Sequence, residues 1–200
     1  MKSKRFVALL LSLVMVFTLI GCGTQTPPDE NGDGQTGTHY KEEIVIAMAD
    51  EFTTIDPMET TAETNQIVQD CTHDLLTDTN LTTMENEGEL VDHWEMVAPD
   101  HWIFYLKENV TFHDGTKLNV DDVEFTFERA KDHAATANYM AMIKEFVKVD
   151  DLTFEIYLTQ GNVDFNYTLA ANSLAILSKE AFETMPEEDA VKIGTGPWIF

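Results

Sequence analysis

The sequence predicts a fold of the α/β class, with helices and strands mixed along the chain (α+β). One observation is the segment WIFYL at residues 102–106, where aromatic and β-branched side chains lie on both sides of an extended backbone. Another is residues 119–130, where Asn119 suits an N-cap and two aspartates suit the first turn of a helix. The buried stripe of this helix follows i, i+4, i+7 spacing: Val123, Phe127 and Ala130. We expect a strand covered on both faces, then a turn, then an amphipathic helix.

Other strands are predicted from apolar patterning. Residues 43–49, EIVIAMA, are almost continuously apolar, which is typical of a central strand of a covered sheet. Residues 153–158 alternate between apolar and polar and predict a half-exposed strand. Residues 94–97 should pair with 102–106 through a turn that contains Pro99 and Asp100.

Turns and helices complete the prediction. His113, Asp114 and Gly115 form a turn because Asp bonds its own backbone and Gly accepts a positive φ. The helices are expected at residues 63–76 (on an Ile67–Cys71 face), 139–146, 164–171 and 179–185, with a polar connection at 80–89. Residues 194–197 form a tight turn that leads into a strand at 198–200.

Several short motifs occur in a fixed order over residues 43–200. They are IDP (55–57), LVDHWE (90–95), FYL (104–106), VTFHDGT (110–116), DDV (121–123), VDDLT (149–153), ILSKE (176–180) and GTGPW (194–198). Together they closely resemble the family 5 extracellular solute-binding proteins, the receptors of peptide, dipeptide and nickel ABC importers. The resemblance implies a periplasmic-binding-protein type II-like fold that is incomplete here, with the first strand of the large lobe and the smaller insert domain.

The N-terminal residues predict export. Lys2, Lys4 and Arg5 precede an apolar run, which is typical of a signal peptide, and residues 19–22 resemble a lipobox in which Cys22 takes the lipid. An ordinary secretory signal with a chance cysteine is the alternative. Residues 23–38 contain no large apolar side chain and predict a flexible tether.

The expected division of the chain follows from the leader and the resemblance. Residues 1–21 are a lipoprotein signal peptide, 22–39 the lipidated cysteine and tether, 40–57 the first strand and loop of the large lobe, 58–193 the insert domain, and 194–200 the return into the large lobe. Family members are much longer, so we expect an N-terminal portion whose half cleft binds weakly; a compact stand-alone domain is the alternative.

Charge and cysteine content restrict the partners. Removal of residues 1–21 takes away three of 12 basic residues and none of 36 acids, which changes the net charge from −24 to −27. Nucleic acid and anionic lipid are therefore not expected as partners. Once Cys22 is lipidated, Cys71 is left as a buried free thiol without a disulfide.

The sequence contains no catalytic constellation, so we expect neither an enzyme nor a cofactor. Ser173 and Ser178 lack a nucleophile-elbow motif, and there is no Gly-rich phosphate loop. His93 with His101, or His113 with His133, could converge on a cation such as nickel, but their spacing is not that of a metal motif. No metal site is predicted, His113 is expected to be a structural hydrogen-bond partner, and a metal-binding receptor or surface protein stays the alternative function.

The resemblance implies a ligand site for peptides. The loop after Pro57 would face the cleft, which nominates residues 58–63 and above all Thr60, Thr61 and Ala62, and Tyr139 matches a tyrosine that peptide-binding relatives present to the ligand. A helix cap at the threonines and a half-buried Tyr139 are the alternatives. The implied partners are a peptide, ABC permease subunits and, through the lipid, the outer face of the cell membrane or the periplasm.

Overall fold

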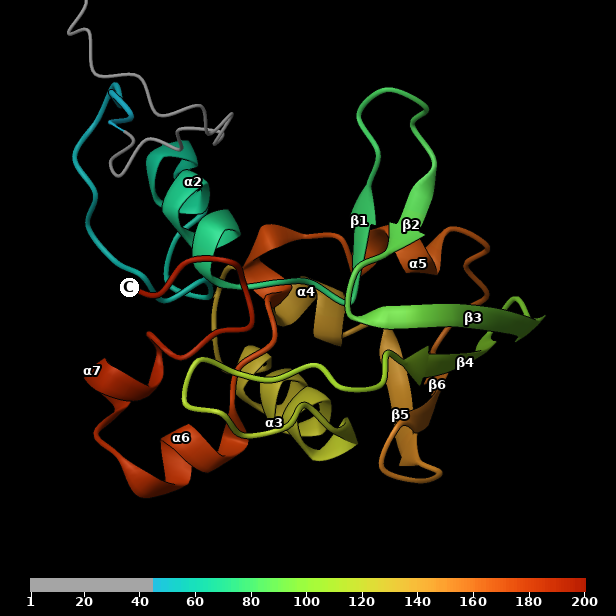
Figure 1. Ribbon diagram of the computed structural model, residues 1–200. Coiled ribbons are helices and arrows are strands. Elements are labelled where there is room, and N and C mark those ends of the chain that lie inside the picture. The colour runs from blue at the N-terminus through green and yellow to red at the C-terminus, as the bar shows by residue number, and fades with distance from the viewer. Residues whose placement is uncertain (1–44) are drawn as a thin grey trace, which may run out of the picture. The chain divides into compact units, whose positions relative to one another are not determined.

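A four-stranded antiparallel sheet is the central element of the computed structural model, which describes residues 45–200 (Figure 1). Its order is β3-β4-β6-β5, with β3 at Val91–Ala98, β4 at His101–Leu106, β6 at Thr153–Leu158 and β5 at Ile143–Lys148. Trp94 pairs with Phe104, and Phe104 pairs with Phe154. The predicted hairpin at residues 94–106 and the predicted strand at 153–158 are confirmed.

Only one face of this sheet is buried. Phe104 and Phe154 are 0% exposed and their rings stack at 5.3 Å, while Phe165 lies edge-on to Phe104 from the helical side. On the other face His101 stacks on Tyr157 at 4.2 Å and both rings stay half-exposed. The expectation that residues 102–106 are covered on both faces is wrong, because helices cover only the inner face and ring stacking covers the outer one in part.

Helix α3, Val120–Ala130, forms where it was predicted and packs on the buried side of the sheet. The Asn119 side chain accepts a hydrogen bond from the amide of Asp121, and the Asp122 carboxylate accepts one from the amide of Asn119, which forms a capping box. Phe127 meets Phe146 of β5 edge-on at 5.9 Å. Cap and buried stripe therefore fix both the start and the rotation of the helix.

The predicted helix at residues 139–146 is wrong. Helix α4 ends after one turn, at Ala137–Met140, and β5 then begins at Ile143. Phe146 pairs with Ile156 of β6. The edge of the sheet offers the backbone a full ladder of hydrogen bonds, and this tertiary pairing overrides a weak helical pattern.

A second, two-stranded sheet stands out from the first (Figure 1). It consists of β1, Thr77–Thr79, for which nothing was predicted, and β2, Asn86–Gly88, which lies within the polar connection expected at residues 80–89. The Thr77 hydroxyl donates to the Asn166 carbonyl at 2.8 Å. Contact with helix α5, Phe165–Thr168, therefore anchors the hairpin.

Helix α2, Glu63–Thr72, ends four residues before the predicted end at residue 76. Its buried residues are polar, namely Thr64, Asn65, Gln69 and Thr72, whereas Ile67 is 36% exposed. The predicted Ile67–Cys71 face is thus wrong, and Cys71 is a free, half-buried thiol. The polar face has a physical reason, since it meets loop backbone that needs hydrogen-bond partners.

The C-terminal helices surround a buried connection. They are the 3-10 helix η2, Asn172–Leu174, and the helices α6, Lys179–Thr184, and α7, Glu187–Ala190. Ile176 and Leu177, between η2 and α6, are 0% exposed. The helix predicted at residues 179–185 is confirmed, and the one predicted at 164–171 is shortened to α5.

Two predicted strands do not form among the described residues. Ile46 is 59% exposed and Ile199 is 75% exposed, and the backbone is irregular at residues 45–49 and 198–200. A strand needs a neighbour for its amide and carbonyl groups, and no described strand pairs with either segment. Residues 43–44, the leader at 1–21 and the segment 22–39 lie outside the described residues, and the divisions at 57/58 and 193/194 stay predictions. None of the helices in residues 45–200 has the length and apolar character to span a bilayer.

Candidate functional site

The loop before α2 holds the first part of the predicted site. Thr61 and Ala62 are exposed, and the Thr60 hydroxyl accepts a hydrogen bond from the Ala62 amide at 3.1 Å. Met58, in the same nominated segment, is only 1% exposed and belongs to the core. The loop therefore presents residues 60–62 to solvent while Met58 fastens it to the protein.

Tyr139 lies in α4, half-buried, and packs against the same hydrophobic core that Met58 enters. The two parts of the predicted site thus border one core, the loop through Met58 and the helix through Tyr139. Whether Tyr139 and residues 60–62 contact a ligand stays a prediction, and Cys22 lies outside the described residues.

Asp56 organises the loop from within. Its carboxylate Oδ1 accepts a hydrogen bond from the Met58 amide at 2.9 Å, and its carbonyl accepts one from Gln69 Nε2 at 3.1 Å. The side chain of Asn65 donates to the Thr54 carbonyl at 2.9 Å. Asn65 and Gln69 therefore use the polar face of α2 to satisfy loop backbone.

Arg129 of α3 reaches the same carboxylate. Its Nη1 donates to Asp56 Oδ1 at 3.1 Å and its Nη2 donates to Asp56 Oδ2 and, at 2.8 Å, to Glu187 Oε1. The guanidinium lies 5.2 Å from the centre of the Phe182 ring. Burial lowers the pKa of Arg129, but its hydrogen bonds to Asp56 and Glu187 outweigh burial and raise that pKa above its ordinary value.

An open depression of about 440 Å³ lies beside this loop. Thr54, Asp56, Glu59 and Glu187 contribute to its lining. Arg129 supplies one positive charge against the carboxylates of Asp56, Glu59 and Glu187, so the depression keeps a net negative charge.

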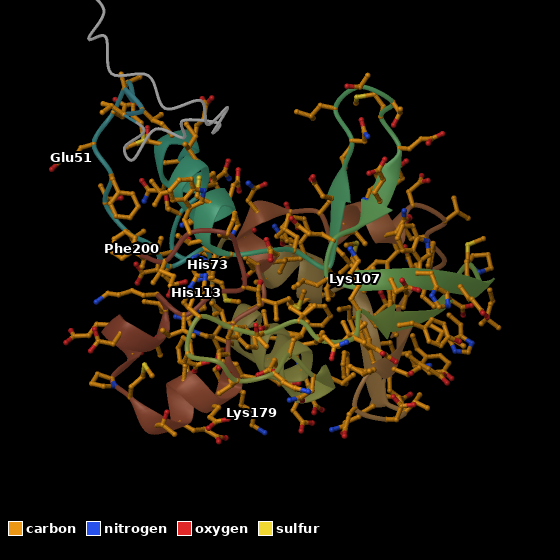
Figure 2. All side chains as sticks on the ribbon, in the orientation of Figure 1. Glu51, His73, Lys107, His113, Lys179 and Phe200 are labelled. Carbon is orange, nitrogen blue, oxygen red and sulfur yellow. The ribbon has the colours of Figure 1, made fainter. Side chains whose placement is uncertain are left out.

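The C-terminal segment is held by two histidines, His73 and His113, which lie next to each other (Figure 2). His113 Nε2 donates to the Gly196 carbonyl at 2.8 Å, and its Nδ1 accepts from the Gly194 amide at 3.3 Å. A Cβ on Gly194 would lie 2.0 Å from the Thr72 carbonyl oxygen, so only glycine fits. The prediction that His113 is a structural hydrogen-bond partner is confirmed.

His73 is buried and neutral. Its Nε2 donates to the Val191 carbonyl at 3.1 Å, and its Nδ1 faces the Thr72 hydroxyl at 2.8 Å. Burial, with a smaller contribution from the neighbouring His113, lowers the pKa of His73 to about 4, against the opposing hydrogen bond to Val191 and the charge of Asp56. No local sequence pattern distinguishes this histidine from the others.

Two of the other histidines that were considered for a metal, His93 and His101, have carboxylate partners. His93 Nδ1 lies 2.9 Å from Asp92 Oδ2, and His101 Nε2 lies 2.8 Å from Glu155 Oε2. In the part of the chain that the structure describes, no three His, Cys, Asp or Glu side chains gather as metal ligands would.

Residues 85–200 match the family described as "Bacterial extracellular solute-binding proteins, family 5 Middle". The chain belongs to this family. The resemblance drawn from the short motifs and the predicted fold class are both confirmed.

Among curated proteins, the chain is 32% identical over 123 residues to the HTH-type transcriptional regulator SgrR of Escherichia coli K12, which is 62% of this chain and 21% of that protein. The chain thus spans about a fifth of the length of the curated relatives it matches.

Solved structures of binding proteins share the fold. DppA of Helicobacter pylori in complex with peptide STSA has a TM-score of 0.66 at 25% identity, covering 75% of this chain and 35% of that one. HbpA2 of Haemophilus parasuis has a TM-score of 0.63 at 30% identity, covering 74% and 36%. OppA of Burkholderia pseudomallei, at 17% identity and a TM-score of 0.65 over 73% and 33%, shows the fold alone.

Sequence reasoning missed the Asp56–Arg129 pair. One signal was available, because Arg129 is the only arginine after the leader in a chain with 36 acidic residues. Arginine is the residue that pairs with buried carboxylates in a fixed geometry.

Proposed function

We propose that this protein is the lipid-anchored substrate-binding component of an ABC importer, which captures oligopeptides or dipeptides and delivers them to the membrane permease. The observation that carries the proposal is the family match over residues 85–200. DppA of Helicobacter pylori, which shares the fold at 25% identity, was solved with a bound peptide. The role is capture and delivery, without catalysis and without nucleic acid.

In this proposal the loop at residues 60–62 and Tyr139 line the ligand cleft. An extended peptide is bound chiefly through its backbone, by hydrogen bonds from loop amides and hydroxyls, while roomy hydrated pockets accept varied side chains. An exposed loop with Thr60 and Thr61 on a fixed base suits this task. Tyr139 adds an aromatic surface and a phenol.

The decisive experiment is capture of peptides by the full-length gene product. The purified protein is incubated with a mixed tripeptide library, washed, and the retained peptides are identified by mass spectrometry. We expect many tripeptides to be retained, and fewer with Thr61→Tyr, which crowds the exposed loop. The matched control is Thr82→Tyr, an exposed threonine on the β1–β2 hairpin. Retention of nickel in place of peptides, measured by titration with NiCl₂, would reject the peptide proposal.

The anchor is tested separately. We propose that Cys22 is lipidated after cleavage behind Gly21, because an apolar leader precedes the Leu19–Cys22 motif. Cys22→Ala is expected to release the protein from the membrane fraction and to change signal processing, while Cys71→Ala changes neither. Unchanged membrane association of Cys22→Ala would refute lipid anchoring.

A further inference from the structure

We propose that Asp56 and Arg129 are the positioning residues of the ligand loop: their ion pair sets the backbone conformation in which residues 60–62 are presented. That residues 60–62 bind ligand rests on the proposed function. The positioning of the loop by the pair does not.

One carboxylate oxygen atom of Asp56 accepts two hydrogen bonds. Asp56 Oδ1 accepts the Met58 amide at 2.9 Å, which closes the turn, and also Arg129 Nη1 at 3.1 Å, which fastens the turn to α3. Arg129 Nη2 holds the second oxygen, Oδ2. A planar guanidinium on both oxygens fixes the plane of the carboxylate, and the carboxylate then fixes the direction of the Met58 amide.

The pair is buried more deeply than stability alone would favour. The side chains of Arg129 and Asp56 are 11% and 6% exposed. Two charges lose their hydration at such a place, and apolar residues of the same volume generally stabilise a protein as well or better. A buried bidentate pair does supply a single orientation, which is what a binding loop requires.

Helix α2 also holds the loop, through side chains of its polar face. Asn65 Nδ2 donates to the Thr53 hydroxyl and to the Thr54 carbonyl, each at 2.9 Å, and Gln69 Nε2 donates to the Asp56 carbonyl. Residues 60–62 are half-buried or exposed and lie outside the core cluster, so the hold on residues 53–58 on one side and the start of α2, with its N-cap at Ala62, on the other determine where they lie. Of the contacts that hold residues 53–58, only the two hydrogen bonds from Arg129 to the Asp56 carboxylate join the loop to α3.

Glu187 offers a matched control. It contacts the same Arg129 Nη2 at 2.8 Å, but its own side chain is 68% exposed. Its removal leaves the Asp56–Arg129 fork intact. A general loss of charge near Arg129 can therefore be separated from a loss of positioning.

The test compares three forms of the full-length protein with the parent: Arg129→Lys, the double variant D56N/R129M, and the control Glu187→Gln. The double variant leaves no unpaired buried charge and keeps an acceptor for the Met58 amide, so it is the variant that should fold even where Arg129→Lys does not. Amide hydrogen exchange is measured for Met58 and for the β4 and β6 amides, together with retention of the mixed tripeptide library.

We expect the Met58 amide to exchange about tenfold faster or more in Arg129→Lys and in the double variant, since a charge-assisted hold on its acceptor is lost, with β4 and β6 unchanged. Peptide retention should decrease in the same two variants, and Glu187→Gln should match the parent in both Met58 exchange and peptide retention. Unchanged Met58 exchange in the folded double variant, or equal acceleration in β4 and β6, would overturn the proposal. If the parent retains no peptide while Met58 still responds, the proposed function fails and the positioning pair stands.

Discussion

The sheet with α3 and the two segments that flank it are held by different forces. In the sheet region, aromatic rings pack on one another, as Phe104 on Phe154 at 5.3 Å and Phe146 on Phe154 at 5.1 Å. In the flanking segments, residues 53–58 and 191–196, apolar anchors such as Met58 are joined by buried polar contacts that involve Asp56, His73, His113 and Arg129. Apolar packing depends on volume and hardly on pH, whereas buried polar contacts depend on donor geometry and protonation. The two regions should therefore respond to different perturbations.

The largest effect is expected from emptying the aromatic core. Phe104→Ala should lower the free energy of unfolding by about 3–5 kcal/mol, because a fully buried ring is lost and a cavity stays behind. Phe127→Ala should cost a similar amount. The control is Ile103→Ala, the neighbouring strand residue on the half-exposed outer face. Urea unfolding measures all three, and a Phe104→Ala curve that matches that of Ile103→Ala would contradict the core assignment.

The next largest effect is the pH dependence of stability that comes from His73, the residue that bonds the flanking segment at residues 191–196. The folded pKa of His73, about 4, lies below its ordinary value of 6.5, so the folded state resists protonation. The stability it supports is complete above pH 6.5 and is lost as the pH falls from 6.5 to about 4, by about 3 kcal/mol in total.

The measurement is urea unfolding of the parent and of His73→Gln at pH 7.5 and pH 4. Gln can still donate to the Val191 carbonyl but does not titrate, so the loss on acidification should be smaller in the variant by about 3 kcal/mol. An equal loss in both proteins would show that His73 does not carry the acid sensitivity.

The same contrast explains what could be predicted from the sequence. The strand at residues 102–106 and the helix from Asn119 follow from local patterns, namely alternation, spacing and a cap, and both are found. The polar contacts join residues far apart in sequence, as Asp56 and Arg129 are, and no local pattern encodes them. For the same reason the buried face of α2 was assigned to Ile67, when the loop required Asn65 and Gln69. Tertiary pairing likewise turned residues 143–146 into a strand.

A smaller effect should follow from crowding the close approach at Gly194. A Cβ there would lie 2.0 Å from the Thr72 carbonyl oxygen and 2.9 Å from the His73 ring, so backbone has to move. Gly194→Ala should lower the free energy of unfolding by about 1–3 kcal/mol, as overpacking does. Gly161→Ala is the control, because the nearest atom to a Cβ at Gly161 would be the side-chain atom Pro99 Cβ at 3.0 Å, and no backbone atom would be as close as at Gly194. Equal melting temperatures for the two variants would argue against a tight passage at Gly194.

The smallest effect comes from Glu89, whose ionisation should change stability with pH in the direction opposite to that of His73. Glu89 Oε2 accepts the Leu75 amide at 2.7 Å where α2 leads into β1. Burial, with the charges of Asp74, Asp78 and Asp70, raises the pKa of Glu89 to about 7 against the opposing hydrogen bond from the Leu75 amide.

A folded pKa above the unfolded value of 4.5 means that folding favours the protonated carboxyl, so stability decreases as the pH rises from 4.5 to about 7. Glu89→Gln keeps an acceptor for the Leu75 amide and removes the charge, so it should raise the melting temperature at pH 8 and change it little at pH 4. Partial exposure of Glu89 to solvent makes the gain smaller than the effects above. Glu85→Gln, at an exposed acid of the neighbouring β1–β2 hairpin, is the control. A gain at pH 8 that Glu85→Gln reproduces would come from the net negative charge of the whole chain. A gain confined to Glu89→Gln would show that the buried, ionised carboxylate of Glu89 lowers stability at high pH, whereas protonation of His73 lowers it at low pH.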